Sequence, residues 1–376
     1  MSLNRPHGGV LVNRIAQKKN IQTIAGTIEI DEIAVRDLEL IANGAYSPLD
    51  GFMTKEDYES VVDRMRLKNG ILWSIPITLP IDEKTARMLV KGRMVKLNYN
   101  NETYGVMEVS EVYEPDKEKE AVSVYGTSDR NHPGVKKLFA RPNIYAAGKI
   151  MLMKRLKKEF PEYHFDPFET RKKFQQLGWK TIAGFQLSSV LTRTHEYLQK
   201  VVLEIVDGLF FHPLIGGARE SEFQADVLIE SYEVLLNKFY PLERVWFAIF
   251  PASTRYAGPK ETVFHAIVRK NYGCTHFVIE PDYAGCSHDD SAYDAYKLAS
   301  LYEDEIGMKI LNFKRSFYCK ACQQIASEKT CPHSHKHRIF LSDDALKNML
   351  KNGKFPPPEL IRPEVIHVLT MKNKQA

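Results

Sequence analysis

The run Thr181-Ile182-Ala183-Gly184-Phe185 decides the fold class, because it begins an alternation of short apolar strands and amphipathic helices. A set of apolar residues then recurs at helical spacing: Leu198, Val201, Val202 and Ile205. Residues 245–250 and 275–279 are further predicted strands, and residues 261–270 between them predict a helix. Strands that alternate with helices indicate a parallel α/β sheet, whose ligand sites lie where strands end and helices begin.

The chain before this alternation has a different pattern. Three segments alternate or run apolar between polar turns and therefore predict strands: 75–79, 94–97 and 105–109. Residues 151–160 are basic and look helical, and the Asp166-Pro167 break marks the change of rhythm. We expect a β-rich N-terminal domain over residues 1–165 and an α/β domain over residues 166–318.

Composition limits the classes of partner. The chain has 376 residues, of which 44% are hydrophobic and 26% charged, so two or three folded domains are expected. The net charge of +5 is mild and spread along the chain, so it indicates small-anion binding no more than solubility, and we expect no nucleic-acid partner. No apolar run approaches the roughly 20 residues of a membrane helix, and Met1 to Pro6 is not an apolar leader. We expect a cytoplasmic protein with no membrane partner.

A cysteine cluster predicts a metal site. Of the five cysteines, three lie in the pattern Cys319-x2-Cys322-x8-Cys331-x3-His335, which suits one tetrahedral zinc ion. Four protein ligands would leave no open position, so the zinc should be structural. His333 and His337 compete with His335, although His333 is expected to be cramped. The alternative is a group of free thiols. Residues 319–376 form the predicted zinc-binding C-terminal segment.

Longer segments resemble one known family. They include residues 6–9, 46–53, 125–129 and 132–135 in the N-terminal domain, and residues 211–216, 255–259, 264–266 and 269–273 in the α/β domain. The cysteine cluster and residues 362–365 continue the resemblance, which is to ATP sulfurylase (sulfate adenylyltransferase) and covers nearly the whole chain. It implies a PUA-like N-terminal domain, a Rossmann-like nucleotidyltransferase domain and a homodimer or higher homo-oligomer. No Gly-x4-Gly-Lys-Ser/Thr loop of a kinase domain occurs.

The resemblance also implies an activity within sulfate assimilation. In that family a sulfate oxygen attacks the α-phosphorus of ATP, magnesium-bound pyrophosphate leaves, and adenylyl sulfate forms. The protein positions the reactants and stabilises charge, without a covalent intermediate. The implied ligands are ATP with magnesium and a small oxyanion acceptor.

The first of two family loops reads Gln186-Leu187-Ser188-Ser189-Val190-Leu191-Thr192-Arg193-Thr194-His195 in this chain. The family pattern is Gln-x-Arg-Asn-Pro-x-His-x-x-His, at the start of a helix whose N–H groups attract anions. The resemblance implies catalytic positions at Gln186, Ser188, Ser189, Thr192 and His195. Gln186 would donate to the oxyanion and His195 would stabilise the leaving phosphates, while Ser188 stands in place of an arginine.

The second loop, Gly-Arg-Asp-His-Ala-Gly in the family, reads Glu280-Pro281-Asp282-Tyr283-Ala284-Gly285 here. Its arginine is Pro281, and Glu280 adds a carboxylate that with Asp282 could hold magnesium or simply be solvated. The implied nucleotide- and anion-binding positions are Gln186, Leu187, His212, Arg255, Asp282, Tyr283, Ala284 and Gly285. His212 is interpreted either as a phosphate donor or as a loop anchor.

Three alternative functions are compatible with the differences between these two loops and the family pattern. Two lost arginines would cost roughly a thousandfold in transition-state stabilisation, unless Arg193, Arg219 or Arg255 compensates. The first hypothesis is therefore a working sulfate adenylyltransferase with compensation. The second is a nucleotidyltransferase for another acceptor, because serine and threonine open room and supply hydroxyl groups. The third is a catalytically silent binding or assembly protein.

Overall fold

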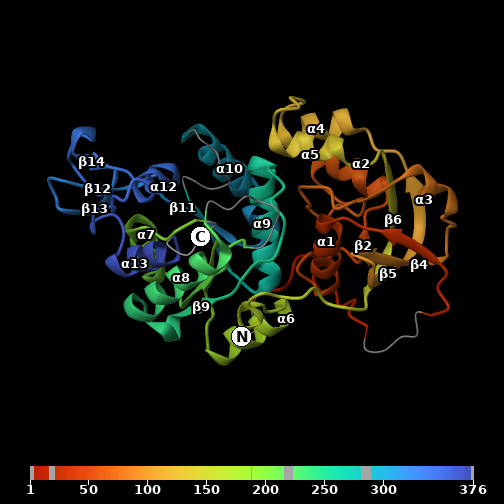
Figure 1. The fold of residues 1–376 in the computed structure, drawn as a ribbon, viewed down its shortest axis with the longest axis horizontal. Helices are drawn as coiled ribbons and strands as arrows, with labels where there is room; N and C mark the ends of the chain where they lie inside the picture. Colours follow the sequence, from red (N-terminus) through yellow and green to blue (C-terminus); the bar gives the residue numbers. More distant parts are fainter. Residues whose placement is uncertain (1–3, 17–21, 188, 216–222, 281–288, 374–376) are drawn as a thin grey trace.

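The computed structural model describes residues 4–16, 22–187, 189–215, 223–280 and 289–373 (Figure 1). Its strands form three sheets, of six, five and three strands. The six-stranded sheet belongs to the N-terminal domain, the five-stranded sheet to the central domain and the three-stranded sheet to the C-terminal segment. Among the described residues, no helix combines the length and apolar character that a membrane span requires.

The N-terminal sheet has the order β1-β4-β5-β6-β2, and β3 also pairs with β6. Its strands are β1 (Gly26–Glu29), β2 (Gly51–Phe52), β3 (Leu79–Ile81), β4 (Met94–Tyr99), β5 (Glu102–Tyr113) and β6 (Ile144–Leu152). Its helices are α1 (Glu32–Ala42), α2 (Lys55–Arg64), α3 (Glu83–Met88), α4 (Lys117–Tyr125) and α5 (Pro133–Ala140). Figure 1 shows α1 on the side of this domain that faces the central domain.

Two of the three strands expected in this domain are confirmed, as parts of β4 and β5. The prediction for residues 75–79 is wrong except for Leu79, the first residue of β3. The segment is apolar because Ile75 and Ile77 are buried at 1% and 0% exposure, not because it pairs along its length. Pro76 between them has no N–H to donate to a sheet.

The predicted helix over residues 151–160 is also wrong. Met151 and Leu152 end β6, and the chain after them continues without regular structure. Its backbone is held by the N-terminal domain instead, since the Lys154 N–H donates to the Tyr104 carbonyl (3.0 Å) and the Leu156 N–H to Glu39 Oε2 (3.1 Å). These contacts satisfy the N–H groups that a helix would otherwise have used.

The central domain confirms the predicted parallel α/β sheet, with the strand order β11-β10-β7-β8-β9. The strands are β7 (Ile182–Phe185), β8 (Gly208–Phe211), β9 (Val245–Phe247), β10 (His276–Ile279) and β11 (Lys309–Asn312). The helices are α6 (Pro167–Gln176), α7 (Arg193–Leu203), α8 (Ala225–Phe239), α9 (Gly258–Tyr272), α10 (Asp289–Leu301) and α11 (Glu303–Ile306), with the short turns η1 (Pro161–Tyr163) and η2 (Leu242–Arg244). Each predicted strand and helix of this domain is present.

Helix α9 joins the two domains and is buried on all sides. The Phe264 ring lies edge-on against Tyr46 and Trp73 of the N-terminal domain, at centroid distances of 5.0 and 5.5 Å. The Asn271 amide donates to the carbonyls of Ala45 (3.0 Å) and Ser47 (2.9 Å). Buried aromatic and amide contacts of this kind fix the relative position of the domains more specifically than apolar area alone.

The C-terminal segment consists of β12 (Ser316–Cys319), β13 (Gln324–Ser327), η4 (His335–His337), β14 (Arg338–Ile339), α12 (Asp343–Lys351) and α13 (Pro363–Asn373). Helix α13 packs against α8 of the central domain. Leu346, Ile361 and Leu369 are fully buried in the same apolar cluster as the inner faces of α7 and α8. The segment therefore shares the core of the central domain, while its three strands and the cysteine cluster have a small core of their own and contact α7 through β12 and β13.

Candidate functional site

The parallel sheet brings the two predicted loops to one edge. Gln186 directly follows β7 and Glu280 directly follows β10, and these strands are neighbours with Phe185 opposite Val278. Both residues therefore leave the sheet at its carboxyl edge, where α7 begins after Thr192. Ligands of parallel α/β sheets bind at such an edge.

The start of α7 is organised by Thr192 and His195. The Thr192 N–H donates to His195 Nδ1 (3.1 Å), and the Thr192 hydroxyl lies 3.0 Å from the same nitrogen. Because Nδ1 accepts from the backbone, the neutral ring carries its proton on Nε2. The Thr192-x-x-His195 spacing is that of a capping box, which is a sequence signal for the start of a helix at this position.

His195 is a neutral donor rather than a charge at pH 7. Burial lowers its pKa to about 4, and its side chain is 18% exposed. Its Nε2 lies 4.0 Å from Oε1 of Glu280, a residue that is only 6% exposed. The sequence did not reveal this neighbour, because 85 positions separate the two residues along the chain. Glu280 is therefore no solvated surface acid, which was one of the two interpretations from the sequence.

Gln186 offers an amide to this edge. Its Oε1 atom is buried and has no hydrogen-bond partner among the residues described. A buried polar atom without a partner carries an energetic penalty that a bound ligand or water can relieve. Gln186 is thus suited to contact a small polar guest.

The other positions of the first loop hold the backbone in place. Leu187 is 9% exposed and its carbonyl accepts from the Leu214 N–H (3.1 Å). The Ser189 carbonyl accepts from the Tyr232 hydroxyl (2.6 Å), and Val190 is fully buried. Ser188 of this loop and Asp282, Tyr283, Ala284 and Gly285 of the second loop lie outside the described residues, so their predicted roles stay predictions.

The predicted anion-binding role of His212 needs correction. Its side chain is 0% exposed and lies against the rings of Phe210 and Tyr272, at centroid distances of 4.3 and 4.6 Å. Burial, reinforced by the charge of Arg269, holds the pKa of His212 well below its usual value. A ligand could not touch this ring without displacing the core, so the loop-anchor interpretation fits.

Arg255 is also placed differently from the prediction. Its guanidinium pairs with the Asp37 carboxylate of α1, and the two side chains are 12% and 1% exposed. Burial raises the pKa of Asp37, and the charge of Arg255 opposes that shift. Arg255 therefore links the two domains, and it does not compensate at the sheet edge for a missing arginine.

The metal cluster has a different fourth member from the one predicted. His333 Nδ1 lies 3.7, 3.1 and 3.5 Å from the sulfur atoms of Cys319, Cys322 and Cys331, and these ligand atoms all lie within 4.8 Å of one another. The structure brings His333, one of the two competing histidines, to the three cysteines in place of His335, which begins the exposed turn η4. The Cys322–Cys331 sulfur distance of 3.6 Å suits two ligands of one tetrahedral zinc, which are about 3.7 Å apart.

Comparison with known proteins agrees with this architecture. Residues 4–155 match the family described as PUA-like domain, and residues 161–372 match the family described as ATP-sulfurylase. A solved structure titled "Hexameric APS kinase from Thiobacillus denitrificans" superposes with a TM-score of 0.79 at 21% identity, covering 99% of this chain and 68% of that one. At that identity the likeness concerns the fold alone.

Relatives named sulfate adenylyltransferase match over almost their full length. The protein from Chloroflexus aurantiacus (strain ATCC 29366) is 47% identical over 98% of this chain and 97% of its own length. Those from Nostoc punctiforme and Halothermothrix orenii are both 46% identical, over 96% and 99% of this chain and 94% and 100% of their own lengths. Together with the family match over residues 161–372, these relatives show that the chain belongs to the ATP-sulfurylase family.

Proposed function

We propose that this protein transfers the adenylyl group of ATP to sulfate, giving adenylyl sulfate and pyrophosphate. The observation that carries the proposal is the carboxyl edge of β7 and β10, where Gln186 follows β7 and His195 lies in the first turn of α7. The full-length relatives named sulfate adenylyltransferase support the same reaction. A sulfate oxygen would form the bond to the α-phosphorus, and the bond from that phosphorus to the β-phosphate oxygen would break.

The chain's own groups act by position and polarity. The N-terminus of α7 places the positive end of the helix dipole at this edge, which would favour a phosphate, while the Arg193 N–H already donates to the Leu360 carbonyl (2.8 Å). His195, held through Nδ1, directs an Nε2 proton that can donate to a leaving phosphate oxygen. The amide nitrogen of Gln186 would donate to an oxygen of the acceptor and so orient it. Magnesium bound to ATP would neutralise the charge of the pyrophosphate.

Zinc is the metal that we propose for the cysteine cluster, in a structural role. Cys319, Cys322, Cys331 and His333 supply four ligands and leave no position for a substrate. The ion would hold β12 and β13 together at the turn between them. We retain a homo-oligomer as an expectation, which light scattering of the purified protein would test.

The test is pyrophosphate release from ATP and magnesium, with and without sulfate. We expect sulfate to stimulate release, and His195→Ala to lower kcat/KM by about 100-fold to 1000-fold. His367→Ala, which removes an exposed histidine of α13, is the matched control and should leave kcat/KM unchanged. Absence of sulfate stimulation at saturating ATP would rule out the proposal.

Glu280 favours a second candidate, transfer to an acceptor with less negative charge than sulfate. This buried carboxylate faces His195 at the sheet edge, where it repels a second dianion beside the triphosphate. Ser188 and Pro281 supply no positive charge in the positions where the family pattern has arginine. The same assay with a panel of carboxylates and phosphate esters tests this candidate. If neither sulfate nor any of these acceptors stimulates pyrophosphate release, the result would favour a catalytically silent binding protein.

A further inference from the structure

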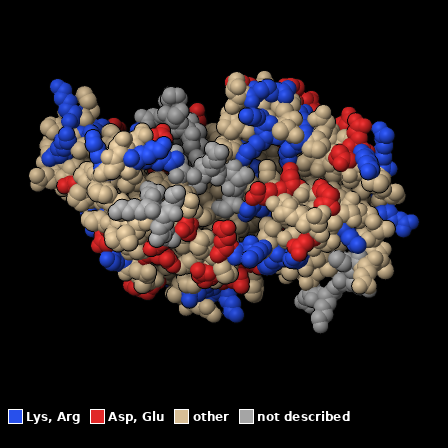
Figure 2. Space-filling model, viewed as in Figure 1, with Lys and Arg blue, Asp and Glu red and all other residues tan. Residues whose placement is uncertain are grey.

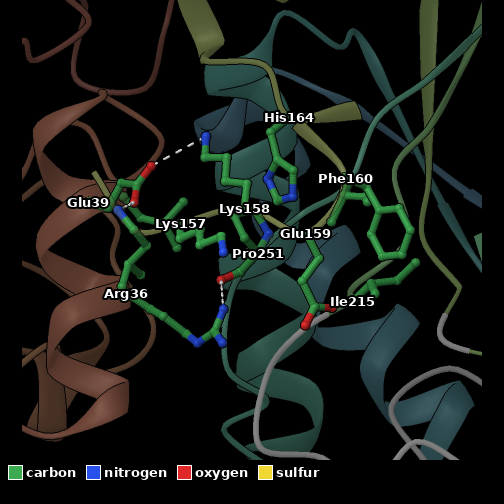
Figure 3. A pocket seen from close by; sticks show the side chains of 12 residues that line it. Arg36, Glu39, Lys157, Lys158, Glu159, Phe160, His164, Ile215 and Pro251 are labelled. Atoms are coloured by element: carbon green, nitrogen blue, oxygen red, sulfur yellow. Dashed lines mark hydrogen bonds and ion pairs between the residues drawn. The ribbon is translucent and has the colours of Figure 1, made fainter. Parts of the chain in front are cut away.

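A cavity lies between the two domains (Figure 3), and neither Gln186 nor His195 is among the residues that line it. Its volume is about 190 Å³. One wall is α1, a second is the irregular connector over residues 156–160 with His164, and the third is the carboxyl side of β8 and β9 at Ile215, Ile249 and Pro251. Both domains and their connector thus contribute to one partly open cavity.

The inner part of this cavity is apolar. Leu40, Phe160, Ile215 and Ile249 line it, and Phe160 and Ile215 lie together at one side in Figure 3. An apolar protein cavity of roughly 150 Å³ can hold a benzene molecule. The space is therefore large enough for a compact organic group of that size, and it is lined by too much apolar surface to suit a bare inorganic ion.

The polar part of the lining carries a net positive charge. Three cations, Arg36, Lys157 and Lys158, face the cavity together with two carboxylates, Glu39 and Glu159. Lys158 contacts Glu39 (3.4 Å), and Arg36 bonds to Glu32 and to the Pro251 carbonyl. Lys157 makes no ion pair with any residue that the structure describes. Because Arg36 is paired with Glu32 and Lys158 with Glu39, Lys157 is the cation of the lining that can meet a ligand with one negative charge.

His164 adds a polar atom that lacks a partner. Its Nδ1 is buried and has no hydrogen bond to a described residue. Burial, with the charges of Lys158 and Arg36, lowers the pKa of His164 to about 4, so the ring is neutral at pH 7. A neutral imidazole can still donate a hydrogen bond to an oxygen of a ligand.

The cavity also adjoins the sheet edge described above. The Leu214 N–H donates to the Leu187 carbonyl (3.1 Å), and the Ile215 N–H donates to the Phe250 carbonyl (3.3 Å). The chain after β8 is thus bonded on one side to the loop that contains Gln186 and on the other to the chain that carries Ile249 and Pro251. A ligand in the cavity would lie beside the candidate site, on the β8 and β9 side of it.

We infer that this interdomain cavity binds a small organic monoanion: a carboxylic acid with a compact apolar body, which enters the apolar part while its carboxylate meets Lys157 and His164. The inference concerns binding alone and does not depend on adenylyl transfer. In the sequence, the cations of this connector form the basic run at residues 154–158, which lies within the segment 151–160 that was predicted to be a helix.

Benzoate and benzamide are suitable probes, because they share a shape and differ in charge. Titration calorimetry of the full chain should show benzoate binding at least about tenfold more tightly than benzamide, the ratio expected of one charge-assisted contact. Lys157→Ala should remove this preference. Lys172→Ala, an exposed lysine of α6, is the matched control and should keep it.

Two variants that fill the cavity locate the binding. Ile249→Trp and Ile215→Phe should each weaken benzoate binding by about tenfold or more, in protein whose thermal unfolding remains cooperative. Equal affinity for benzoate and benzamide would overturn the inference. So would the absence of saturable benzoate binding below about 10 mM, or wild-type affinity in a folded cavity-filling variant.

Discussion

The cysteine cluster and the carboxyl edge of the central sheet are both assembled from chemistry-bearing side chains, but over very different lengths of chain. The cluster gathers Cys319, Cys322, Cys331 and His333 from within a single short stretch. The edge gathers Gln186, His195 and Glu280 from segments almost a hundred residues apart. The spacing of residues along the chain therefore predicts which side chains meet in the cluster. At the sheet edge, the order of the strands decides which side chains become neighbours.

The two regions also differ in what surrounds the ligand atoms. The cluster has a small core of its own, with Phe317 and Ala326 as its buried apolar residues. The edge is built on the large core of the central domain, where Val190 and Leu191 are fully buried. We therefore expect substitutions in the cluster to act mainly on stability and substitutions at the edge mainly on chemistry.

The largest expected effect tests the identity of the fourth metal ligand. His333→Ala should abolish binding of one zinc ion per chain and destabilise the C-terminal segment by several kcal/mol, because zinc binding contributes directly to the folding of small sites. His335→Ala is the matched control and should keep both zinc and stability. Elemental analysis and thermal unfolding measure the two quantities. Zinc loss in His335→Ala alone would restore the choice made from the sequence.

The next effect is a pH dependence of stability at the sheet edge. The pKa of His195 is about 4 in the folded chain and about 6.5 for a histidine exposed to water, so the unfolded state binds one more proton between these pH values. The free energy of unfolding should fall as the pH is lowered from about 6.5 to about 4, by up to about 3 kcal/mol from this residue.

Urea denaturation of wild type and His195→Asn at several pH values isolates the contribution of His195, because the remaining titratable groups are common to both proteins. The variant should lose less stability on acidification than the wild type. Identical pH profiles would show that His195 is accessible to protons in the folded state, and the edge would then be more polar than its burial indicates.

Glu280→Gln should have a smaller effect, on acceptor charge. Removing the buried carboxylate removes its repulsion of a dianion, so the kcat/KM for sulfate should rise by about tenfold, equivalent to about 1.4 kcal/mol. Initial rates of sulfate-dependent pyrophosphate release measure the change. Glu243→Gln, which changes an exposed glutamate of η2, is the control. A decreased rate in Glu280→Gln would mean that the carboxylate is used productively.

Thr192→Val should have the smallest effect. The substitution removes the hydroxyl that caps α7, and should lower the free energy of unfolding by about 1 kcal/mol. The Thr192 N–H still donates to His195 Nδ1, so the ring should keep its tautomer and kcat/KM should change little. Chemical denaturation and steady-state kinetics test the two parts. A large loss of activity would show that the hydroxyl itself contacts the substrate.

Predictions from the sequence were most accurate where the physical signal is local and repetitive. The strands at residues 181–185 and 275–279 and the helix between 261 and 270 were recognised because burial imposes a period on the chain. Residues 75–79 and 151–160 were misassigned for the opposite reason. Their apolar and basic residues serve the interior and the domain interface without regular backbone pairing.

The candidate site was predicted only in part. Gln186 and His195 were selected because they keep a family pattern, and the sheet edge brings them to the same loop region. His212 and Arg255 were selected on the same grounds, but burial among aromatic rings and pairing with Asp37 give them structural roles. Residue type and spacing do not show whether a side chain is buried. The role of a histidine or arginine that matches a family pattern, in binding or in structure, is therefore decided only when its neighbours are known.

By itself the sequence determined the fold class from periodicity, the family from the resemblance of its longer segments, and a three-cysteine cluster able to hold a metal from spacing. The tertiary structure alone decided which histidine joins the cysteines, which carboxylate faces His195, and that a cavity with a net positive lining opens between the domains. These contacts join segments whose separation along the chain bears no relation to their distance in space. Packing of the sheet, of α9 and of the connector brings them together.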